Sequence, residues 1–310
     1  MKHLITIFLT LACINPSSGE SLLTGNSMIK HSVEINNHKF AVYEKEHDSP
    51  KDIIVFIHGR TISALPNFDL QVQSKNVSVM DAFIKNGFQV YAMDMRGFGN
   101  TPRDASGWIN PEKASKDVTG LLEWVIKRHP NSEKPTLFGY SYGSLVSHFV
   151  VQEKPELVSQ LVLYGHPIEH TYASRYVQND VKEINTEAEL IRKPNSVEWA
   201  SSDFIINSAE KEVIDAYISS ALKLDPTLAD WHKLSQWTQL KPGRITVPTL
   251  LINGVHDPVS PVDKLAVFFG EISNPDRSWV IIPKSGHAAH LENSSGQMVS
   301  SIVNFIRRKE

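Results

Sequence analysis

Ser141, Asp257 and His287 are the residues of this 310-residue chain whose types and order could perform nucleophilic acyl transfer. Ser141 lies in the sequence GYSYG at 139–143, between an apolar run and a helix-compatible segment at 144–152. A serine hydroxyl is a weak nucleophile at neutral pH, so it needs a base to take its proton and an acid to orient that base. Asp257 and His287 follow Ser141 in the order expected of a triad whose serine sits on a strand-to-helix turn.

Two glycines predict a tight turn around Ser141. Gly139 and Gly143 stand two residues before and two residues after it. Small residues at these places let an entering strand and a leaving helix cross without Cβ clashes. The amino terminus of the helix would direct backbone N–H groups toward the reacting centre, where they favour an oxyanion. A five-residue match is weak by itself, because a glycine-flanked serine also suits an ordinary turn.

Asp257 and His287 each follow an apolar, strand-like run, at 249–254 and 279–283. The carboxyl ends of parallel strands meet at one edge of a sheet, so loops that are far apart in sequence converge there. Asp257 also lies beside prolines, which suits a turn-forming role, and a chain with 13 histidines allows coincidence. The joint order and contexts favour a triad in which Asp257 orients His287 and His287 activates Ser141.

Short apolar runs separated by helix-compatible segments predict the fold class. Two runs, 33–35 and 39–43, flank Asn36-Asn37 and predict an antiparallel hairpin. The alternation of further runs with helical stretches indicates an α/β fold, with a mainly parallel eight-stranded sheet and helices on both faces. These further runs are 53–57, 89–93, 136–140, 160–164, 249–253 and 279–282.

Five segments together resemble the α/β-hydrolase family: FIHGR at 56–60, DMRGFG at 94–99, GYSYG at 139–143, GVHD at 254–257 and SGHAAH at 285–290. The resemblance implies that the backbone N–H groups of Arg60 and Tyr142 form an oxyanion hole. It also implies that His58 braces the oxyanion loop. Family members that hydrolyse epoxides or remove halides use an aspartate at the elbow, so Ser141 leaves acyl transfer as the main chemistry.

Arg60 departs from the apolar or small residue that often follows His-Gly in this family. Its side chain could bind an anionic part of a substrate. The alternative is a surface arginine or an internal ion pair, and arginine is mostly exposed in folded proteins. We prefer the alternative.

The segment 167–244 interrupts the alternation of strands and helices with charged, helix-compatible sequence, so we expect a helical cap inserted there. Trp199, Trp231 and Trp237 lie in it. We expect them to pack the insertion against the core, the alternative being to line an apolar acyl or aryl site. The expected organisation is a signal peptide at 1–19, a hydrolase core at 20–166 and 245–310, and the cap at 167–244.

A formal net charge of −3 without a basic cluster gives no field that would attract nucleic acid. The expected partner is therefore a small-molecule ester or acyl substrate, and no nucleic acid. We expect no cofactor and no metal, because His166, Glu169 and His170 lack the His-x-x-x-His arrangement of zinc hydrolases. The oligomeric state is left open.

The amino terminus has a short positive region, Met1-Lys2-His3, and an apolar region at 4–12, which predict a signal peptide too short to span a membrane. Small residues at 17–19 suit cleavage before Glu20, so we expect a secreted or periplasmic protein. A buried amino-terminal helix is the alternative. The only cysteine, Cys13, ends the sequence TLAC, which imperfectly resembles a lipoprotein processing site, so a lipid anchor through Cys13 is a second alternative.

These observations favour an exported serine hydrolase that cleaves carboxylic esters of small or medium apolar acyl groups. A second enzymatic interpretation is a serine aminopeptidase resembling the proline iminopeptidases. Against it stand the sequence HGRT at 58–61 and an elbow that is not of the glycine-glycine-serine type. A third interpretation is a non-catalytic binding member of the fold, although such members usually lack a triad residue.

Overall fold

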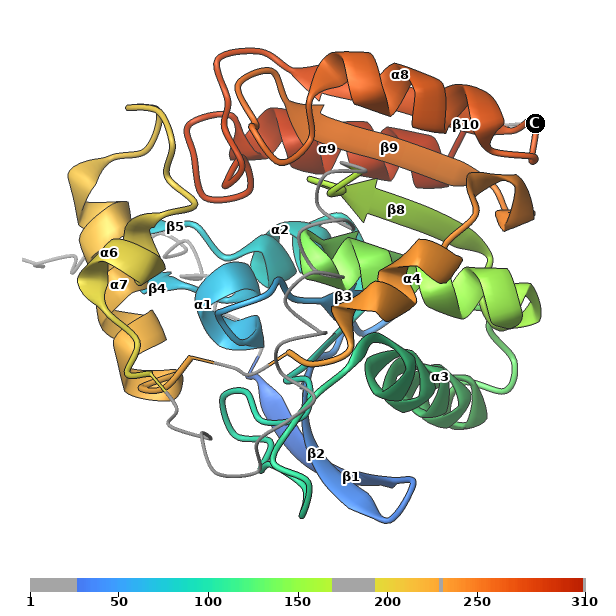
Figure 1. Ribbon diagram of the computed structural model, residues 1–310, viewed down its shortest axis with the longest axis horizontal. Coiled ribbons are helices and arrows are strands. Elements are labelled where there is room, and N and C mark those ends of the chain that lie inside the picture. The colour runs from blue at the N-terminus through green and yellow to red at the C-terminus, as the bar shows by residue number, and fades with distance from the viewer. Residues whose placement is uncertain (1–26, 169–192, 229–230, 309–310) are drawn as a thin grey trace, which may run out of the picture.

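A computed structural model describes residues 27–168, 193–228 and 231–308 and shows a central sheet flanked by helices (Figure 1). The eight strands of the main sheet lie in the order β1-β2-β6-β3-β7-β8-β9-β10. β6, β3, β7, β8, β9 and β10 pair in parallel, whereas β2 pairs antiparallel with both β1 and β6. The strands are β1 Ile29–Ile35, β2 His38–Lys45, β3 Asp52–Ile57, β6 Phe88–Met93, β7 Thr136–Tyr140, β8 Gln160–Tyr164, β9 Thr249–Gly254 and β10 Arg277–Ile282, with a separate small pair β4 Gln71–Val72 and β5 Lys75–Asn76. The predicted fold class is confirmed.

The β1–β2 hairpin turns on Asn36 and Asn37, whose φ angles are 51° and 58°. A type I′ turn requires positive φ at both central residues, and asparagine accepts this conformation more readily than most residues. The two-residue turn places Ile35 opposite His38 in the register of the hairpin. The expected antiparallel hairpin is therefore present.

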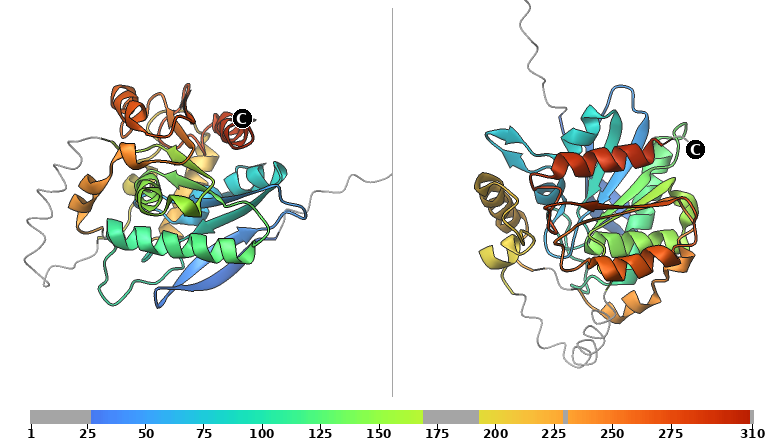
Figure 2. Two further views of the ribbon diagram at one scale, coloured as in Figure 1. Left: turned by 90° about the vertical axis from the view of Figure 1, so that its right-hand side faces the viewer. Right: turned by 90° about the horizontal axis from the view of Figure 1, so that it is seen from above.

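Helices cover both faces of the sheet (Figure 2). Residues of α3, α4 and α8 join one apolar cluster, and residues of α1, α2 and α9 join the other. The helices are α1 Ala64–Phe68, α2 Val79–Lys85, α3 Pro111–Arg128, α4 Tyr142–Glu153, α6 Val197–Ser201, α7 Lys211–Leu224, α8 Val262–Glu271 and α9 Ser295–Ile306, with short 3-10 turns η1 Pro155–Leu157, η2 Leu234–Gln239 and η3 Pro242–Arg244.

β3 illustrates why the parallel strands contain continuous apolar runs. Val55 and Ile57 belong to the cluster that includes α3 and α4, whereas Ile54 and Phe56 belong to the cluster that includes α1, α2 and α9. Successive side chains of a strand point to opposite faces, and here helices cover both faces. All four side chains are consequently buried. The strand ends at Ile57, which places the loop from His58 to Ser63 at the carboxyl edge of the sheet.

α6 and α7 lie apart from the sheet, beside α1 and the β4–β5 pair (Figure 1). A third apolar cluster joins them to the loops after β3 and β10, and its buried members are Ile62, Leu70, Ala200, Val213, Tyr217, Ala221 and Leu291. These two loops also carry Arg60 and His287. The bounds 167–244 expected for the insertion stay a prediction, because residues 169–192 and 229–230 lie outside the described part of the chain.

The three tryptophans of the expected insertion differ in burial. Trp231 and Trp237 are 5% and 7% exposed and join the cluster of α3, α4 and α8, as expected of residues that pack on the core. Trp199 is 50% exposed, so the expectation of packing was wrong for this residue. It lies on α6, whose only buried residue is Ala200, because this five-residue helix turns one narrow face toward its neighbours.

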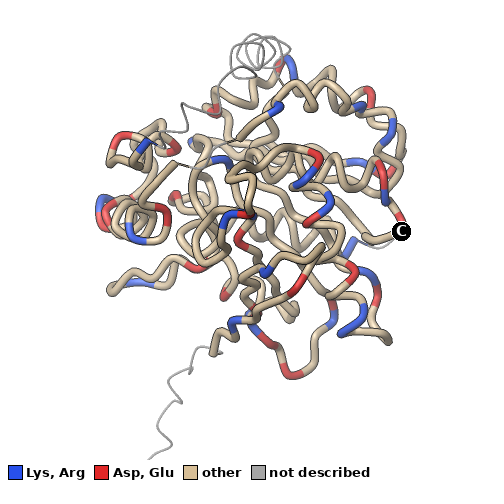
Figure 3. The backbone as a smooth tube through the Cα atoms, turned by 60° about the horizontal axis from the view of Figure 1, so that its bottom comes forward, with Lys and Arg blue, Asp and Glu red and all other residues tan. Residues whose placement is uncertain are grey.

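Basic and acidic residues are interspersed over the face shown in Figure 3. Within the described residues, no helix combines the length and the apolar composition that a membrane span needs. The predicted signal peptide at 1–19, including Cys13, lies outside the described residues.

Candidate active site

Ser141 occupies the turn between β7 and α4, with φ 53° and ψ −120°. A positive φ is strained for a residue with a Cβ and is typical of functional turns. Gly139 and Gly143 explain how the turn closes. A methyl carbon at Gly139 would lie 2.5 Å from the Cα of Ser144, and one at Gly143 would lie 2.5 Å from the carbonyl oxygen of His58. Both glycines are therefore needed for the close crossing that the sequence predicted.

His287 and Asp257 form a hydrogen-bonded pair, with 2.8 Å between Nδ1 of His287 and Oδ2 of Asp257. Asp257 follows β9 and His287 follows β10, and both side chains are buried. A carboxylate on Nδ1 fixes the proton there, which leaves Nε2 as the nitrogen that can accept a proton from a serine hydroxyl. The sequence-predicted acid and base are thus brought together in the order that the triad chemistry requires.

Tyr140 and Tyr164 connect Ser141 to the histidine. The backbone N–H of Ser141 donates to the carbonyl oxygen of Tyr164 at 2.9 Å, and the hydroxyl of Tyr164 donates to the carbonyl oxygen of His287 at 2.6 Å. The ring of Tyr140, directly before Ser141, lies 4.9 Å from the imidazole of His287 between centroids. The elbow and the His287 loop therefore share one rigid support at the sheet edge, which sequence reasoning did not identify.

Gly165 lets the acid–base pair pack against the end of β8. Its φ is 57°, and a methyl carbon there would lie 2.9 Å from Cε1 of His287 and 3.3 Å from Oδ2 of Asp257. Any larger residue would be strained and would also press on the pair. The sequence could have indicated this residue, because Gly165 directly follows the predicted strand 160–164.

Three carboxylates influence the proton affinity of His287. Burial by itself lowers the pKa of the imidazole. The negative charges of Asp257, Asp203 and Glu292, together with the hydrogen bond that His287 donates to Asp257, raise the pKa above its ordinary value. The imidazolium form is therefore stabilised. An imidazolium is also what His287 would become after taking a proton from Ser141.

Asp203 was not predicted from sequence. It follows α6, and its carboxylate accepts a hydrogen bond from the Tyr140 hydroxyl at 3.2 Å. Burial raises the pKa of Asp203, which the charge of His287 and the bond from Tyr140 partly offset. No motif marks this aspartate, because its contacts are made across 63 residues of chain.

Arg60 and Tyr142 are the residues expected to supply oxyanion N–H groups. Arg60 lies in the loop after β3 and Tyr142 is the first residue of α4. Gly59 is close to the nucleophile, since a methyl carbon there would lie 3.3 Å from Cβ of Ser141. The exposed Arg60 guanidinium lies 5.3 Å from the ring centroid of Tyr142, within the range of a cation–π contact. The exposed side chain agrees with the surface arginine that we preferred, and binding of an anionic substrate group stays the alternative.

His58 is buried at the start of the loop 58–63 and is bonded on both ring nitrogens. Its Nδ1 lies 2.9 Å from the carbonyl oxygen of Gly59, and the backbone N–H of Met95 donates to its Nε2 at 2.9 Å. Burial lowers the pKa of His58 to about 3, so the ring stays neutral and donates from Nδ1. This geometry is that of a brace between the loops after β3 and β6.

No metal site is visible in the parts of the chain that the structure describes, where no three histidine, cysteine or acidic residues are arranged to hold an ion. His166 instead lies with Nδ1 2.8 Å from the hydroxyl of Ser144, which also donates to the carbonyl oxygen of Ser141. Glu169 and His170 lie outside the described residues.

Comparison with known proteins shows that the chain is similar to hydrolases. 2-Hydroxy-6-oxo-6-(2'-aminophenyl)hexa-2,4-dienoic acid hydrolase of Metapseudomonas resinovorans is 26% identical over 235 residues, or 72% of this chain and 75% of that protein. Pimeloyl-acyl-carrier-protein methyl ester esterase of Legionella pneumophila is 23% identical over 233 residues, or 73% and 87%. The solved structure of the monoacylglycerol lipase of Paleococcus ferrophilus superposes with a TM-score of 0.64 at 20% identity, covering 86% of this chain and 98% of that one, which shows a shared fold.

A family model extends the similarity across both parts of the expected core. It spans residues 48–294, and this range includes the Ser141 elbow and the loops of Asp257 and His287. The chain therefore belongs to the α/β-hydrolase family described as serine aminopeptidase, S33, and is a serine hydrolase.

Proposed function

We propose that this hydrolase cleaves carboxylic esters of small to medium apolar acyl groups. The observation that carries the proposal is the arrangement at the sheet edge: Ser141 at a strained elbow, with the Asp257–His287 pair held beside it through Tyr140 and Tyr164. The names of similar proteins support esters as the substrate class, since they include a methyl ester esterase and a monoacylglycerol lipase.

In this proposal the hydroxyl of Ser141 attacks the carbonyl carbon while Nε2 of His287 takes its proton. Asp257 stabilises the imidazolium that forms. The N–H groups of Arg60 and Tyr142 hold the negative carbonyl oxygen of the tetrahedral intermediate. The C–O bond to the alcohol then breaks as His287 returns the proton to the leaving oxygen, and water releases the acyl group by the same steps.

Substitution of the nucleophile tests the proposal. Ser141→Ala should lower ester turnover by about 10⁴- to 10⁶-fold, since removal of the nucleophile leaves only binding and oxyanion stabilisation. The measurement is kcat and KM on chromogenic acyl esters of increasing chain length, with far-UV circular dichroism as the folding control. Ester turnover that survives in a folded Ser141→Ala protein would exclude this mechanism.

A second candidate function follows from Asp203. Its carboxylate is near His287 and has no ion pair with lysine or arginine in the described part of the chain. A carboxylate at this place could bind the ammonium group of an aminoacyl substrate, which favours an aminopeptidase as the alternative.

A matched pair of substrates separates the two candidates. Propionyl and alanyl esters of the same chromophore differ by the ammonium group. If Asp203 binds that group, Asp203→Asn should raise KM for the alanyl ester and leave KM for the propionyl ester unchanged. Equal changes for both substrates, or preference for propionyl in the wild type, would favour the simple esterase.

We also propose that the protein is exported through the signal peptide expected at 1–19. The support is the short positive region and the apolar region at the amino terminus. Mass spectrometry of the protein recovered from outside the cytoplasm should give a mature chain that begins at Glu20. A mature chain that begins at a lipid-modified Cys13 would instead favour the membrane-anchored alternative.

A further inference from the structure

The segment that begins at Trp231 contacts both residues that are proposed to form the oxyanion hole. The indole N–H of Trp231 donates to the carbonyl oxygen of Arg60 at 3.1 Å. Its ring also meets the ring of Tyr142 edge to face, with 5.2 Å between centroids. Arg60 lies in the loop after β3 and Tyr142 at the start of α4, so one buried side chain restrains two proposed donors from different elements.

The bond to Arg60 acts on the backbone conformation that presents the proposed donor. The carbonyl and the N–H of Arg60 share one Cα, and Gly59 before it can adopt more backbone conformations than any other residue. The side chain of Arg60 is exposed. Fixing the carbonyl therefore narrows the directions in which the Arg60 N–H can point, and donors that are fixed before the reaction stabilise an oxyanion best.

Trp231 is itself held by the loop that follows β6. Ile109 forms an isolated bridge with Trp231, and the backbone N–H of His232 donates to the carbonyl oxygen of Ile109 at 2.8 Å. The His232 ring stacks on Trp108, with 3.5 Å between centroids. Trp231 thus reaches the oxyanion loop from a fixed position.

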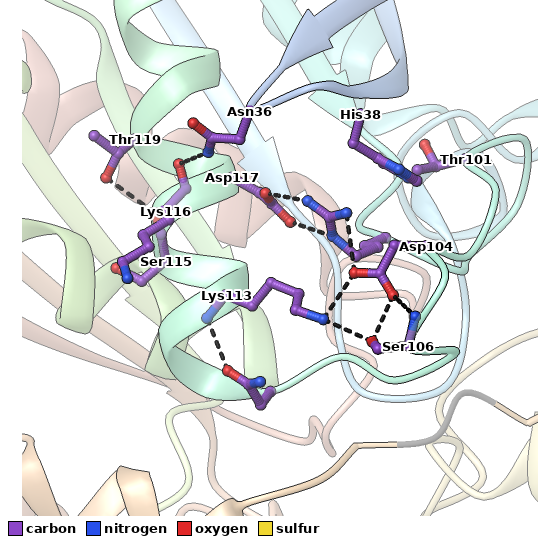
Figure 4. A network of polar contacts seen from close by, with 12 residues as sticks. Asn36, His38, Thr101, Asp104, Ser106, Lys113, Ser115, Lys116, Asp117 and Thr119 are labelled. Carbon is purple, nitrogen blue, oxygen red and sulfur yellow. Dashed lines mark hydrogen bonds and ion pairs between the residues drawn. The ribbon is translucent and has the colours of Figure 1, made fainter. Parts of the chain in front are cut away.

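Figure 4 shows polar contacts between α3 and the loop after β6. Lys113 of α3 donates to Asp104 at 2.7 Å and to the carbonyl oxygen of Trp108 at 3.0 Å. Arg96 bonds Asp117 of the same helix through two nitrogens, at 2.9 and 2.7 Å. A continuous series of contacts therefore runs from α3 through this loop and Trp231 to Arg60.

Asp225 supports the same loop at a second point. This buried carboxylate, just after α7, accepts bonds from the backbone N–H and the hydroxyl of Ser63 at 2.9 and 2.7 Å. It also accepts a bond from the backbone N–H of Gly99 at 2.8 Å. The loop 58–63 is therefore bonded near both of its ends by residues that lie more than 160 positions away in the sequence.

We propose that Trp231 is a positioning residue that sets the oxyanion hole by holding the Arg60 backbone through its indole N–H. The inference rests on the proposed function, because it requires Arg60 and Tyr142 to be the oxyanion donors. Trp231 touches no reacting atom in this account and acts through Arg60.

Trp237 provides a matched control for the experiment. It is buried in the same aromatic cluster, 5.8 Å from Tyr142 and 5.9 Å from Trp231 between ring centroids. Its indole N–H has no hydrogen-bond partner among the described residues. Trp231→Phe and Trp237→Phe thus remove the same chemical group and a similar volume, but only the first breaks a bond to the oxyanion loop.

The test measures kcat and KM on a chromogenic ester, inhibition by a trifluoromethyl ketone, and the rate at which a fluorophosphonate labels Ser141. Loss of a whole oxyanion donor costs about 10²- to 10³-fold in kcat, so a donor that is present but loosely held should cost about 10- to 100-fold. Trp231→Phe should lower kcat, ketone affinity and labelling rate by similar factors, with KM unchanged. Trp237→Phe should change kcat, ketone affinity and labelling rate by no more than about threefold from the wild-type values, well below the cost of a lost donor.

Three outcomes would overturn the inference: equal losses in the two variants, a loss confined to KM, or wild-type labelling in Trp231→Phe. If Trp231→Phe does not fold, a benzothienyl analogue of tryptophan at position 231 keeps the ring shape and lacks only the N–H. The same results are then expected of the analogue, and wild-type rates in it would reject the proposal. Ser141→Ala distinguishes failure of the proposed function from failure of the inference about Trp231. Labelling or ester turnover that persists in Ser141→Ala would reject the proposed function itself.

Discussion

Replacing Gly143 with alanine tests the close crossing of α4 and the loop 58–63. The added methyl carbon would lie 2.5 Å from the carbonyl oxygen of His58 and nearer still to that of Ile57, whereas ordinary contact begins at 3.4 Å. Both obstacles are backbone atoms and cannot rotate away. The chain between β3 and Arg60 must therefore retreat by about 1 Å, or the elbow must open by a similar amount.

The expected cost has two parts. Overpacking of this kind lowers the free energy of unfolding by about 1–3 kcal/mol. A misplacement of about 1 Å beside reacting groups costs on the order of 10²-fold in rate, which corresponds to about 2.7 kcal/mol of transition-state stabilisation. Gly143→Ala should therefore remain largely folded and lose about 10²-fold in kcat/KM, with most of the loss in kcat.

Gly270→Ala is the matched control, because Gly270 also lies in a helix and an added methyl carbon there meets no atom within 4 Å. Helix propensity alone predicts that this change is neutral or stabilises the protein by up to about 1 kcal/mol. Urea unfolding gives the stability of both variants, and ester kinetics give kcat and KM. A Gly143→Ala protein with wild-type stability and kcat/KM within about twofold of wild type would refute the reasoning, since the crossing would not be as tight as the geometry requires.

Two further predictions concern charged groups. Neighbouring carboxylates, Asp203 among them, raise the pKa of His287, so Asp203→Asn should lower this pKa. Because His287 must be neutral to accept a proton, the acid limb of the pH profile of kcat/KM should then move to lower pH. An unmoved limb would show that Asp203 and His287 are not coupled. Arg96→Met leaves the carboxylate of Asp117, 2% exposed, without its guanidinium partner (Figure 4), which should cost about 3–5 kcal/mol in urea unfolding. Adding Asp117→Leu should recover part of that loss, and strictly additive effects would show that the pair is not coupled.

The sheet was predictable because each strand carries its own evidence. Parallel strands that are covered on both faces must be apolar at every position, so β3, β7, β8 and β9 appear in the sequence as continuous runs. The hairpin turn was predictable for a different local reason, since Asn36 and Asn37 both suit positive φ.

The candidate triad was predictable because topology does much of the positioning. Once the runs before Ser141, Asp257 and His287 are recognised as parallel strands, their carboxyl ends must share one edge of the sheet. The pairing of Asp257 with His287 follows from that placement. Gly139 and Gly143 marked the elbow itself, because only residues without Cβ fit the crossing.

Asp203 and Trp231 were not predictable as parts of the site. Asp203 reaches Tyr140 across 63 residues and Trp231 reaches Arg60 across 171, and neither lies in a repeating pattern. Composition also did not separate Trp199, which is half exposed, from Trp231 and Trp237, which are buried. Their roles depend on how the segments 193–228 and 231–244 pack on the core.

The sequence by itself determined the strands, the elbow and the order of the candidate triad, because each of these depends on a residue and its near neighbours. Only the tertiary structure decided which distant side chains surround His287 and which ones hold the loop 58–63. The physical reason is that Tyr140–Asp203 and Arg60–Trp231 are contacts of specific shape between separate segments. No local conformational preference encodes such contacts, since they exist only after the segments that carry Asp203 and Trp231 have packed against the core.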